Sequence, residues 1–449
     1  MSNLFNDTIV GISTALANNA VSIIRLSGDD AVNIVNKVFK GKNLNNVKSH
    51  TINYGHIFDS ETKEIIDEVL VSVFLAPKTY TKENVVEINC HGGIYVTNQV
   101  LDQIVLSGAR LAEAGEFTKR AFLNGRIDLT KAEAVMDMIS SDSKKSLAIA
   151  NSGLRGDIKN LIDSLRSKIL DIIAIINVNI DYPEYDDVEQ LRYDSVLPSI
   201  NEFINQLDKV IDDTKKGQTI KDGIDTVIVG RPNVGKSSLL NAMLKEDKAI
   251  VTNIAGTTRD IVEGKIDFYG LTLNLIDTAG IRKSDDVIEN IGINKSLKSL
   301  EKAQLVLLVI DGSEALTKED EELLEKTKDY KRIIVINKND NDIKVNIENA
   351  VYISSLNKDL KQLEERIKEE FKDLSYNDEP LLFNARQLGL LNKAKESLLS
   401  ARQEAINGQV IDIIAIDLQA AYGCILEILG KSSKEDLLDN IFSKFCLGK

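Results

Sequence analysis

The chain has 449 residues and a formal net charge of −14. This length predicts two or three domains with sizeable cores. The acidic balance excludes a protein that coats nucleic acid without specificity, but it is compatible with a local basic patch. The three cysteines, Cys90, Cys424 and Cys446, have no paired spacing. That usage is typical of a reducing compartment without a disulfide framework.

No secretory signal is visible at the start, since Met1–Val10 lacks a basic region followed by an apolar one. No apolar run approaches the roughly 18 residues that a membrane span requires. We therefore expect a cytoplasmic protein.

Residues 1–118 predict a small α+β domain. Thr8–Ile12 and Val21–Leu26 have the length and apolarity of strands, and Ser27–Asp30 caps a helix that runs to about Phe39. Two more strand patterns and a helix follow at Glu68–Ala76, Asn84–Asn89 and about Ile94–Ser107.

Cys90 and His91 stand where the last of these strand patterns ends. His91 has the side chain of a metal ligand or a base. Because no second His or Cys lies nearby, a polar group at a strand-to-helix turn is the favoured interpretation. Cys90 is interpreted as a half-buried small residue rather than a nucleophile, since no base stands beside it.

Near residue 119 the pattern changes to long amphipathic helices. An apolar stripe at steps of three and four residues predicts one long helix. Its members are Ile158, Leu161, Ile162, Leu165, Ile169, Ile172, Ile173 and Ile176. An acidic, proline-containing turn follows at Asp181–Asp187. Helical patterning resumes near Asp194 and is expected to end at Lys216-Gly217. Three later helices are predicted at Ala385–Asn407, Val410–Leu429 and Lys434–Phe445.

The strand-rich stretch between the helical segments divides the chain. We predict an N-terminal domain (1–118), the first part of a helical domain (119–216), an α/β nucleotide-binding domain (217–373) and the second helical part (374–449). The α/β domain is thus expected to be inserted into one helical domain.

A glycine-rich segment, Gly230–Ser237, follows the apolar run Thr226–Val229 and precedes a helix-forming stretch. Strand, glycine-rich turn and helix in this order make G-x-x-x-x-G-K-S a phosphate-binding loop. Its backbone N–H groups surround phosphate oxygens, Lys236 supplies positive charge and the Ser237 hydroxyl is a ligand for Mg²⁺. A chance match is the alternative, and the motifs that follow exclude it.

Two further motifs come at the ends of apolar strand patterns. Asp277–Gly280 follows Leu271–Ile276, and Asn337–Asp340 follows Arg332–Ile336. A carboxylate at Asp340 accepts from N1–H and the exocyclic amine of guanine, while adenine offers no matching pair of donors. A last strand, Val351–Leu356, carries serines that could close over the base. This order of motifs predicts a GTP-binding domain.

The segment Val251–Asp260 has the character of a mobile loop that meets the γ-phosphate, and Thr258 fits the residue that contacts Mg²⁺. Ile281 stands where many GTPases have a glutamine that orients water. Arg259 and Arg282 are nearby, but the sequence identifies no arginine finger. Asn233 offers an uncharged oxygen near the phosphates, where a monovalent cation could supply positive charge.

Four segments together resemble the MnmE (TrmE) family of tRNA modification GTPases: Gly230–Ser237, Gly256–Asp260, Asp277–Gly280 and the C-terminal Phe445–Lys449. The resemblance covers essentially the whole chain. Other translation-linked GTPases share the nucleotide motifs, whereas the C-terminal pentapeptide and the N-terminal domain are more specific.

The resemblance implies a Ras-like GTPase domain, a folate-binding N-terminal domain and a homodimer that works with an FAD-dependent partner protein (MnmG, also GidA). The pair would add an aminomethyl-type group, such as carboxymethylaminomethyl, to C5 of the wobble uridine of certain tRNAs. The one-carbon unit would come from a tetrahydrofolate derivative.

The resemblance also assigns roles to single residues. K⁺ would be bound by the side chains of Asn233 and Thr257 and the carbonyls of Thr252 and Ile254. Ser237 and Thr258 would hold Mg²⁺, and Glu289 matches a catalytic glutamate that orients water indirectly. The GTP-binding residues would be Asn233, Val234, Gly235, Lys236, Ser237, Ser238, Thr252, Asn253, Ile254, Ala255, Gly256, Thr257, Thr258, Asp277, Thr278, Ala279, Gly280, Asn337, Lys338 and Asp340.

For folate, the resemblance points to Arg25, Glu87, Arg126 and the terminal Lys449. A carboxylate suits the N–H edge of the pterin, and basic groups suit the acids of the ligand. Ordinary surface ion pairs are the alternative. Residues Ser13–Ala20 depart from the proline- and glycine-rich loop usual before the first arginine.

Cys446 lies fourth from the end, where a prenylated cysteine would stand. Gly448 is not aliphatic and Lys449 is not an accepted last residue, so we reject prenylation. In the family this cysteine belongs to a motif that reaches toward the folate site, which makes Cys446 a catalytic candidate. Cys424, inside a helical pattern, is predicted to be a core residue.

A locally basic stretch is a candidate for tRNA contact, although a solvated helix face explains it equally well. It comprises Lys144, Lys145, Arg155, Lys159, Arg166 and Lys168. Two hypotheses of different class remain. The first is a tRNA-modifying GTPase with flavoprotein and folate. The second is a switch in ribosome assembly or signalling that performs no one-carbon chemistry.

Overall fold

The computed structural model describes residues 7–141, 143–181, 193–246, 262–268, 270–276, 300–374, 382, 384–431, 435–445 and 448. The chain divides into two compact units, Met1–Met136 with Leu426–Lys449, and Asp137–Ile425. Within the described ranges, no helix combines the length and apolarity needed to cross a membrane.

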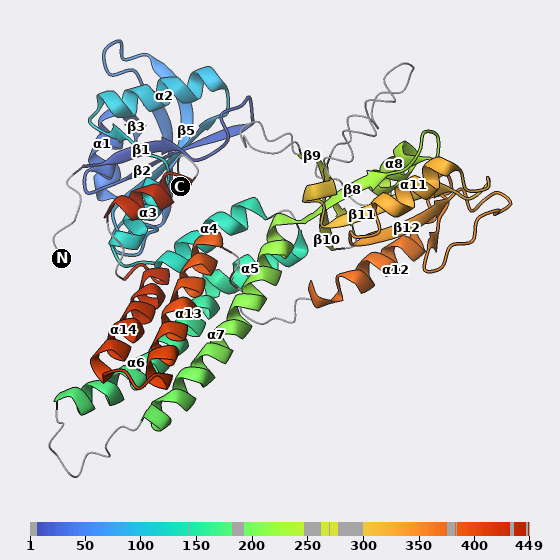
Figure 1. Cartoon of the computed structure of the whole chain (residues 1–449). Helices are drawn as coiled ribbons and strands as arrows, with labels where there is room; N and C mark the ends of the chain where they lie inside the picture. Colours follow the sequence, from blue (N-terminus) through green and yellow to red (C-terminus); the bar gives the residue numbers. More distant parts are fainter. Residues whose placement is uncertain are drawn as a thin grey trace. The chain divides into compact units, whose positions relative to one another are not determined.

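The first unit is built on a seven-stranded sheet with the order β3-β4-β5-β6-β2-β1-β7 (Figure 1). Its strands are β1 Ile9–Ile12, β2 Val21–Ser27, β3 Phe39–Gly41, β4 Thr51–Phe58, β5 Ile65–Phe74, β6 Val85–His91 and β7 Arg110–Leu111. All neighbouring pairs are antiparallel except β1 and β7. Its helices are α1 Ala31–Val38, η1 Leu44–Asn46, α2 Ile94–Leu106, α3 Glu116–Leu123, α4 Leu129–Ser140 and α15 Glu435–Phe442, of which α4 continues into the second unit.

The two faces of this sheet differ. Helices α1 and α2 contribute Val35 and Val100 to a core that includes Val71 of β5 and Ile88 of β6. Because side chains alternate along a strand, the intervening residues of these strands point to the opposite face. That face carries the exposed apolar side chains Ile52, Tyr54 and Leu70, with Tyr54 paired to Leu70 across β4 and β5. We call these three residues the open-face patch.

Strand β4 has no counterpart among the strands predicted from the sequence. Its apolar Ile52 and Tyr54 lie on the open face at 68% and 60% exposure, so the usual alternation of buried apolar and exposed polar residues is blurred. Gly55 interrupts the strand pattern as well. A Cβ at Gly55 would lie 2.4 Å from the ring of Phe39, so only glycine allows β3 to pack this closely.

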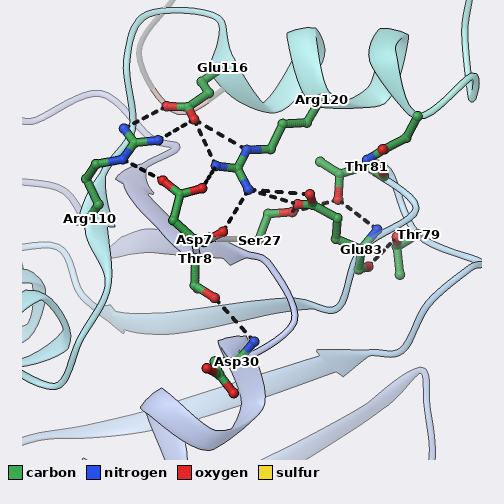
Figure 2. Close-up of polar contacts among 11 residues, drawn as sticks. Asp7, Thr8, Ser27, Asp30, Thr79, Thr81, Glu83, Arg110, Glu116 and Arg120 are labelled. Carbon is green, nitrogen blue, oxygen red and sulfur yellow. Dashed lines mark hydrogen bonds and ion pairs between the residues drawn. The ribbon is translucent and has the colours of Figure 1, made fainter. Parts of the chain in front are cut away.

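A buried ionic cluster fastens α3 to the sheet. Figure 2 shows the Arg120 guanidinium, which is fully buried, between the carboxylates of Asp7, Glu83 and Glu116. Arg120 donates to Asp7 Oδ1 at 2.7 Å and to Glu116 Oε1 at 2.9 Å. Burial alone would raise the pKa of Glu116, but hydrogen bonds from Arg110, the Glu113 N–H and Arg120 outweigh it and hold that pKa below its usual value.

The C-terminal segment closes this unit. Phe442 and Phe445 pack with Leu129 and Ala132 in a separate apolar cluster. Beyond it, the carbonyl oxygen of Gly448 accepts hydrogen bonds from Ser13 Oγ at 3.0 Å and Arg25 at 3.2 Å. Gly448 has a φ of +83°, and a Cβ there would lie 2.2 Å from the Ile12 oxygen, so this docking requires glycine.

The second unit contains a six-stranded sheet with the order β13-β12-β11-β8-β10-β9. The strands are β8 Ile224–Val229, β9 Val262–Phe268, β10 Leu271–Ile276, β11 Leu305–Asp311, β12 Arg332–Asn337 and β13 Val351–Tyr352. All pairs are parallel except β9 with β10. Helices and short 3-10 turns of this part are α8 Lys236–Glu246, η2 Leu300–Lys302, α11 Lys318–Lys326, α12 Lys361–Glu370 and η3 Lys372–Leu374.

The remaining helices are α5 Lys144–Arg155, α6 Asp157–Asp181, α7 Tyr193–Asp222, α13 Ala385–Ile406 and α14 Ile411–Ile428, of which α14 ends in the first unit. Helix α13 packs along α7, and Lys395 pairs with Asp208 at 2.5 Å (Figure 1). The predicted end of α7 at Lys216-Gly217 is wrong, since the helix continues to Asp222. One glycine costs a helix about 1 kcal/mol, which the packing of a 30-residue helix readily outweighs.

Helix α5 belongs to the core of the parallel sheet. Ile149 and Ala150 are fully buried and lie in one apolar cluster with Leu273 and Leu305. The Lys145 ammonium donates to the carbonyl of Leu374 at 3.4 Å. This contact joins α5 to the segment that follows α12.

Candidate functional site

The phosphate loop and the Asn337–Asp340 motif lie at the same edge of the parallel sheet. β8 pairs with β11, and β11 pairs with β12, all in parallel. The carboxyl ends of parallel strands share one edge, so Gly230, Asp311 and Asn337 meet there. Strand order reverses beside β8, which is the position where open α/β sheets bind ligands. Each motif follows the end of a strand, as the apolar runs predicted.

The phosphate loop turns tightly into α8, which begins at Lys236. Val234 is fully buried and anchors the loop in the core. Asn233 has a φ of +64° and an exposed side chain at the tip. The Lys236 ammonium bends back across the loop and donates to the carbonyls of Gly230 and Arg231 at 2.7 and 2.8 Å. Ser237 and Ser238 follow in the first turn of α8, where N–H groups without helical acceptors favour anions.

Asn337 joins the phosphate loop to the base-binding motif. Its buried amide donates to the Val234 carbonyl at 2.9 Å, and its oxygen accepts from the N–H and hydroxyl of Ser355 at 3.1 and 2.9 Å. Gly235 has a φ of +96°, and a Cβ there would lie 2.2 Å from the Asn337 nitrogen. The close approach of these two segments therefore requires glycine at position 235.

Lys338 and Asp340 are held by partners of their own. The Lys338 ammonium contacts Asp311 Oδ2 at 2.5 Å. Burial works to raise the pKa of Asp311, but hydrogen bonds from Lys338 and Ser313 hold that pKa below its usual value. The Ser354 hydroxyl donates to Asp340 Oδ1 at 2.5 Å, which orients a carboxylate that is otherwise exposed. Asp311 stands at the end of the buried strand β11, just as the phosphate loop and the Asn337–Asp340 motif stand at the ends of β8 and β12. The same strand-end signal could have identified Asp311 from the sequence.

Arg231, the second residue of the loop, pairs with two acids that lie beyond β11 in the sequence. Its guanidinium contacts Glu314 at 2.6 Å and the buried Asp320 at 3.2 Å. Asp320 also belongs to the capping box of α11 with Thr317. This contact fastens the phosphate loop to α11 and was not predicted from the sequence.

Several predicted site residues lie outside the described residues. They are Thr252, Asn253, Ile254, Ala255, Gly256, Thr257, Thr258, Asp277, Thr278, Ala279, Gly280, Glu289, Cys446 and Lys449.

A cavity of about 440 Å³ lies in the first unit, at the open face of its sheet. It brings together three residues that the resemblance named for folate, Arg25, Glu87 and Arg126. Arg25 and Glu87 are opposite each other across β2 and β6, and Arg25 Nε donates to Glu87 Oε1 at 2.8 Å. Additional lining residues that the sequence did not suggest are His50, Phe74, Lys78, Thr79, Tyr80, Val85 and Val135.

His91, Cys90 and Cys424, which the sequence analysis considered as possible functional residues, all have ordinary structural surroundings. His91 lies at the turn before α2, as favoured, and its Nδ1 contacts Asp67 at 2.7 Å. Across the described ranges, no group of acidic, His and Cys side chains could hold a metal ion. Burial raises the pKa of the Cys90 thiol to about 11, so it stays protonated. Cys424 lies on α14 as predicted, but it is partly exposed rather than a core residue.

The basic stretch of α5 and α6 is partly neutralised. Arg155 pairs with Asp157 at 3.2 Å and Arg166 with Asp163 at 3.3 Å. Burial lowers the pKa of Lys145, whose ammonium contacts a carbonyl. These ion pairs reduce the positive charge that the stretch presents.

A parallel α/β sheet with a phosphate loop after β8 and an Asn-Lys-x-Asp motif after β12 defines a P-loop protein of the GTPase class. The family model described as MnmE helical domain matches residues 129–446. The model described as GTP-binding protein TrmE N-terminus matches residues 8–126. The chain belongs to the family of the tRNA modification GTPase MnmE.

Curated relatives match over nearly the full chain. The tRNA modification GTPase MnmE of Streptococcus thermophilus (strain CNRZ 1066) is 51% identical over 451 residues, covering 99% of this chain and 98% of the relative. That of Streptococcus pyogenes serotype M12 (strain MGAS9429) is 50% identical with the same coverage. Among solved structures, Era of Aquifex aeolicus bound to GDP and aluminium fluoride aligns at 26% identity over 39% of this chain and 67% of its own, with a TM-score of 0.25.

Proposed function

We propose that this protein hydrolyses GTP and, with an FAD-dependent partner of the MnmG (GidA) kind, adds a carboxymethylaminomethyl or related aminomethyl group to C5 of the wobble uridine of certain tRNAs. The observation that carries the GTPase part is the meeting of the phosphate loop and the Asn337–Asp340 motif at one sheet edge. The tRNA part rests on the family, whose named relatives match this chain over its whole length.

In this proposal the described residues bind and orient the nucleotide. N–H groups of the loop and the first turn of α8 bind phosphate oxygens, and Lys236 adds positive charge once its ammonium leaves the loop carbonyls. Asp340, oriented by Ser354, accepts from the guanine edge. Asn337 keeps the phosphate and base ends of the site at a fixed separation, since it contacts both segments.

Two metal ions are part of the proposal. Mg²⁺ would be held by Ser237 and Thr258, and K⁺ by Asn233, Thr252, Ile254 and Thr257. Asn233 fits this role because its amide is exposed at the loop tip in a left-handed conformation, and no described residue hydrogen-bonds to it. A neutral oxygen suits a weakly charged hard cation. The metals would neutralise charge on the phosphates.

We expect GTP turnover to be much faster in K⁺ than in equimolar Na⁺ at constant Mg²⁺, and Asn233→Ala to remove most of that difference. The comparison of initial rates for phosphate release checks this. Asn241→Ala is the matched control, since Asn241 is also exposed but lies on α8 beyond the loop. Equal rates in both salts would refute the cation site and leave a switch without one-carbon chemistry as the better hypothesis.

We expect Glu289→Ala to retain GTP affinity and to lose most turnover, roughly a hundredfold, as for the loss of a residue that orients a reacting water. Single-turnover hydrolysis and nucleotide binding, measured on the same preparation, separate the two effects. Turnover close to that of the unsubstituted protein would show that Glu289 has no catalytic role.

We also propose a tetrahydrofolate derivative in the cavity of the first unit, with Arg25, Glu87, Arg126 and Lys449 as ligands. A volume of about 440 Å³ with both a carboxylate and cations suits a molecule with a pterin and carboxylates. The hydrogen bonds from Ser13 and Arg25 to Gly448 support this, because they hold the C-terminal tail beside Arg25. Lys449 is the next residue in the sequence, and the family resemblance is the basis for proposing Cys446 as a catalytic residue.

The family further suggests a homodimer. The open-face patch supports a second copy as its occupant, since Ile52, Tyr54 and Leu70 expose large apolar surfaces beside the proposed folate cavity.

We propose the domain bounds 1–118, 119–216, 217–373 and 374–449, with the GTPase domain inserted in the helical one. The packing of α13 on α7 supports this, because these helices flank the sheet in sequence.

A further inference from the structure

The cavity of the first unit holds more positive charge than a ligand with a single acidic group requires. Its lining includes three cations, Arg25, Lys78 and Arg126, but only one acid, Glu87. Glu87 is already hydrogen-bonded to Arg25. Neither Lys78 nor Arg126 has an acidic partner for its side chain among the residues that the structure describes.

Lys78 and Arg126 stand at the mouth of the cavity, since both are exposed whereas Arg25 and Glu87 are half-buried. An exposed His50 lines the same cavity. We call His50, Lys78 and Arg126 the basic rim. A ligand whose uncharged part fills the interior would meet the basic rim with the end that leaves the cavity.

His50 is held in an unusual conformation. Its φ is +63°, which is uncommon for a residue with a side chain and persists only where the surroundings enforce it. The His50 N–H donates to the carbonyl of Val73 at 2.7 Å, and the ring packs edge-on to Phe74 at 5.4 Å. These contacts fix the imidazole against the end of β5, at the cavity.

The His50 ring has a further contact on its Nδ1 side. Ser49 Oγ lies 2.7 Å from His50 Nδ1 and also accepts from the N–H of Leu75 at 2.8 Å. These hydrogen bonds tie the imidazole to the backbone that follows β5 and hold it beside the cavity.

We propose that the basic rim binds the carboxylates of a γ-linked glutamate tail, so that this protein prefers polyglutamylated over monoglutamylated tetrahydrofolate. This inference rests on the proposed folate site. Each added glutamate brings another carboxylate to the basic rim, where Lys78 and Arg126 carry positive charge and His50 offers a polar ring. General attraction does not explain such a preference, because the chain has a net charge of −14 and repels polyanions as a whole.

The test is calorimetric titration of the full chain with 5-formyltetrahydrofolate in its monoglutamate and triglutamate forms. We expect the triglutamate to bind roughly five- to tenfold more tightly, since each exposed charge pair contributes little and several act together. The ratio should shrink at higher ionic strength. Lys78→Ala should reduce the ratio toward one, while Lys42→Ala, at an exposed lysine outside the cavity, should preserve it.

The outcomes separate this inference from the folate proposal. Equal affinity of the two forms, or an unchanged ratio in Lys78→Ala together with His50→Ala, would overturn the role of the basic rim while folate binding stands. Absence of binding by either form would overturn both. Circular dichroism of each variant shows whether a lost preference reflects unfolding instead. Arg126→Lys keeps the positive charge at the rim, so this variant should retain most of the affinity ratio.

Discussion

Asp340→Asn is expected to lower the affinity for GTP by at least about a hundredfold without unfolding the protein. The Asp340 carboxylate is exposed, and one oxygen accepts from the Ser354 hydroxyl, so its second oxygen and remaining lone pairs are free for the guanine edge. An asparagine replaces one acceptor with an N–H₂ donor. That donor would face the N–H donors of guanine. The complex would lose a charge-assisted hydrogen bond and would leave two desolvated donors without acceptors.

The same substitution should improve binding of xanthosine triphosphate, whose ring has a carbonyl where guanine has the exocyclic amine. Dissociation constants for both nucleotides, measured by calorimetry, check the exchange of preference. Asp342→Asn is the matched control, since Asp342 is exposed and only two residues away in the same loop. If Asp340→Asn bound GTP as tightly as the unsubstituted chain does, the base would have to be recognised by other residues.

The nucleotide site was predictable because its motifs coincide with strand ends. Hydrophobic runs located β8, β10 and β12, and parallel strands bring their carboxyl ends to one edge. From those facts alone, Lys236 and Asp340 had to lie near each other. The contacts that hold these motifs together could not be predicted from the sequence. The hydrogen bond from Asn337 to the Val234 carbonyl, for example, joins residues that are 103 positions apart.

The cavity of the first unit was much less accessible to sequence reasoning. Arg25 and Glu87 were named only through a resemblance, and their pairing depends on the register of β2 with β6. His50 and Lys78 lie in loops without a recognisable motif. Strand β4 was missed because its exposed apolar residues mask the alternation. Polar sites assembled from antiparallel neighbours leave no local signature, whereas phosphate loops do.

Arg120→Met is expected to destabilise the N-terminal sheet by about 3–5 kcal/mol, the usual cost of removing one partner from a buried ionic cluster. Arg120 is fully buried, and it contacts Glu116 and Asp7 directly and Glu83 at 3.4 Å (Figure 2). Methionine fills similar space but would leave Glu83, at 2% exposure, without its cationic partner. Glu83 would then be a buried carboxylate without a compensating charge, which is costly even with the hydrogen bond from the Ser27 hydroxyl.

Hydrogen exchange of the β1 and β2 amides reports this loss in the full chain, where a single unfolding free energy is poorly defined for several domains. Protection there should fall by roughly a hundredfold or more, since about 3 kcal/mol corresponds to a factor of that size. Arg155→Met is the control. The Arg155 side chain, which pairs with Asp157, is 64% exposed. An ion pair this exposed contributes at most about 1 kcal/mol to stability. Equal protection in the two variants would mean that Arg120 is an incidental pairing and that apolar packing alone holds α3 on the sheet.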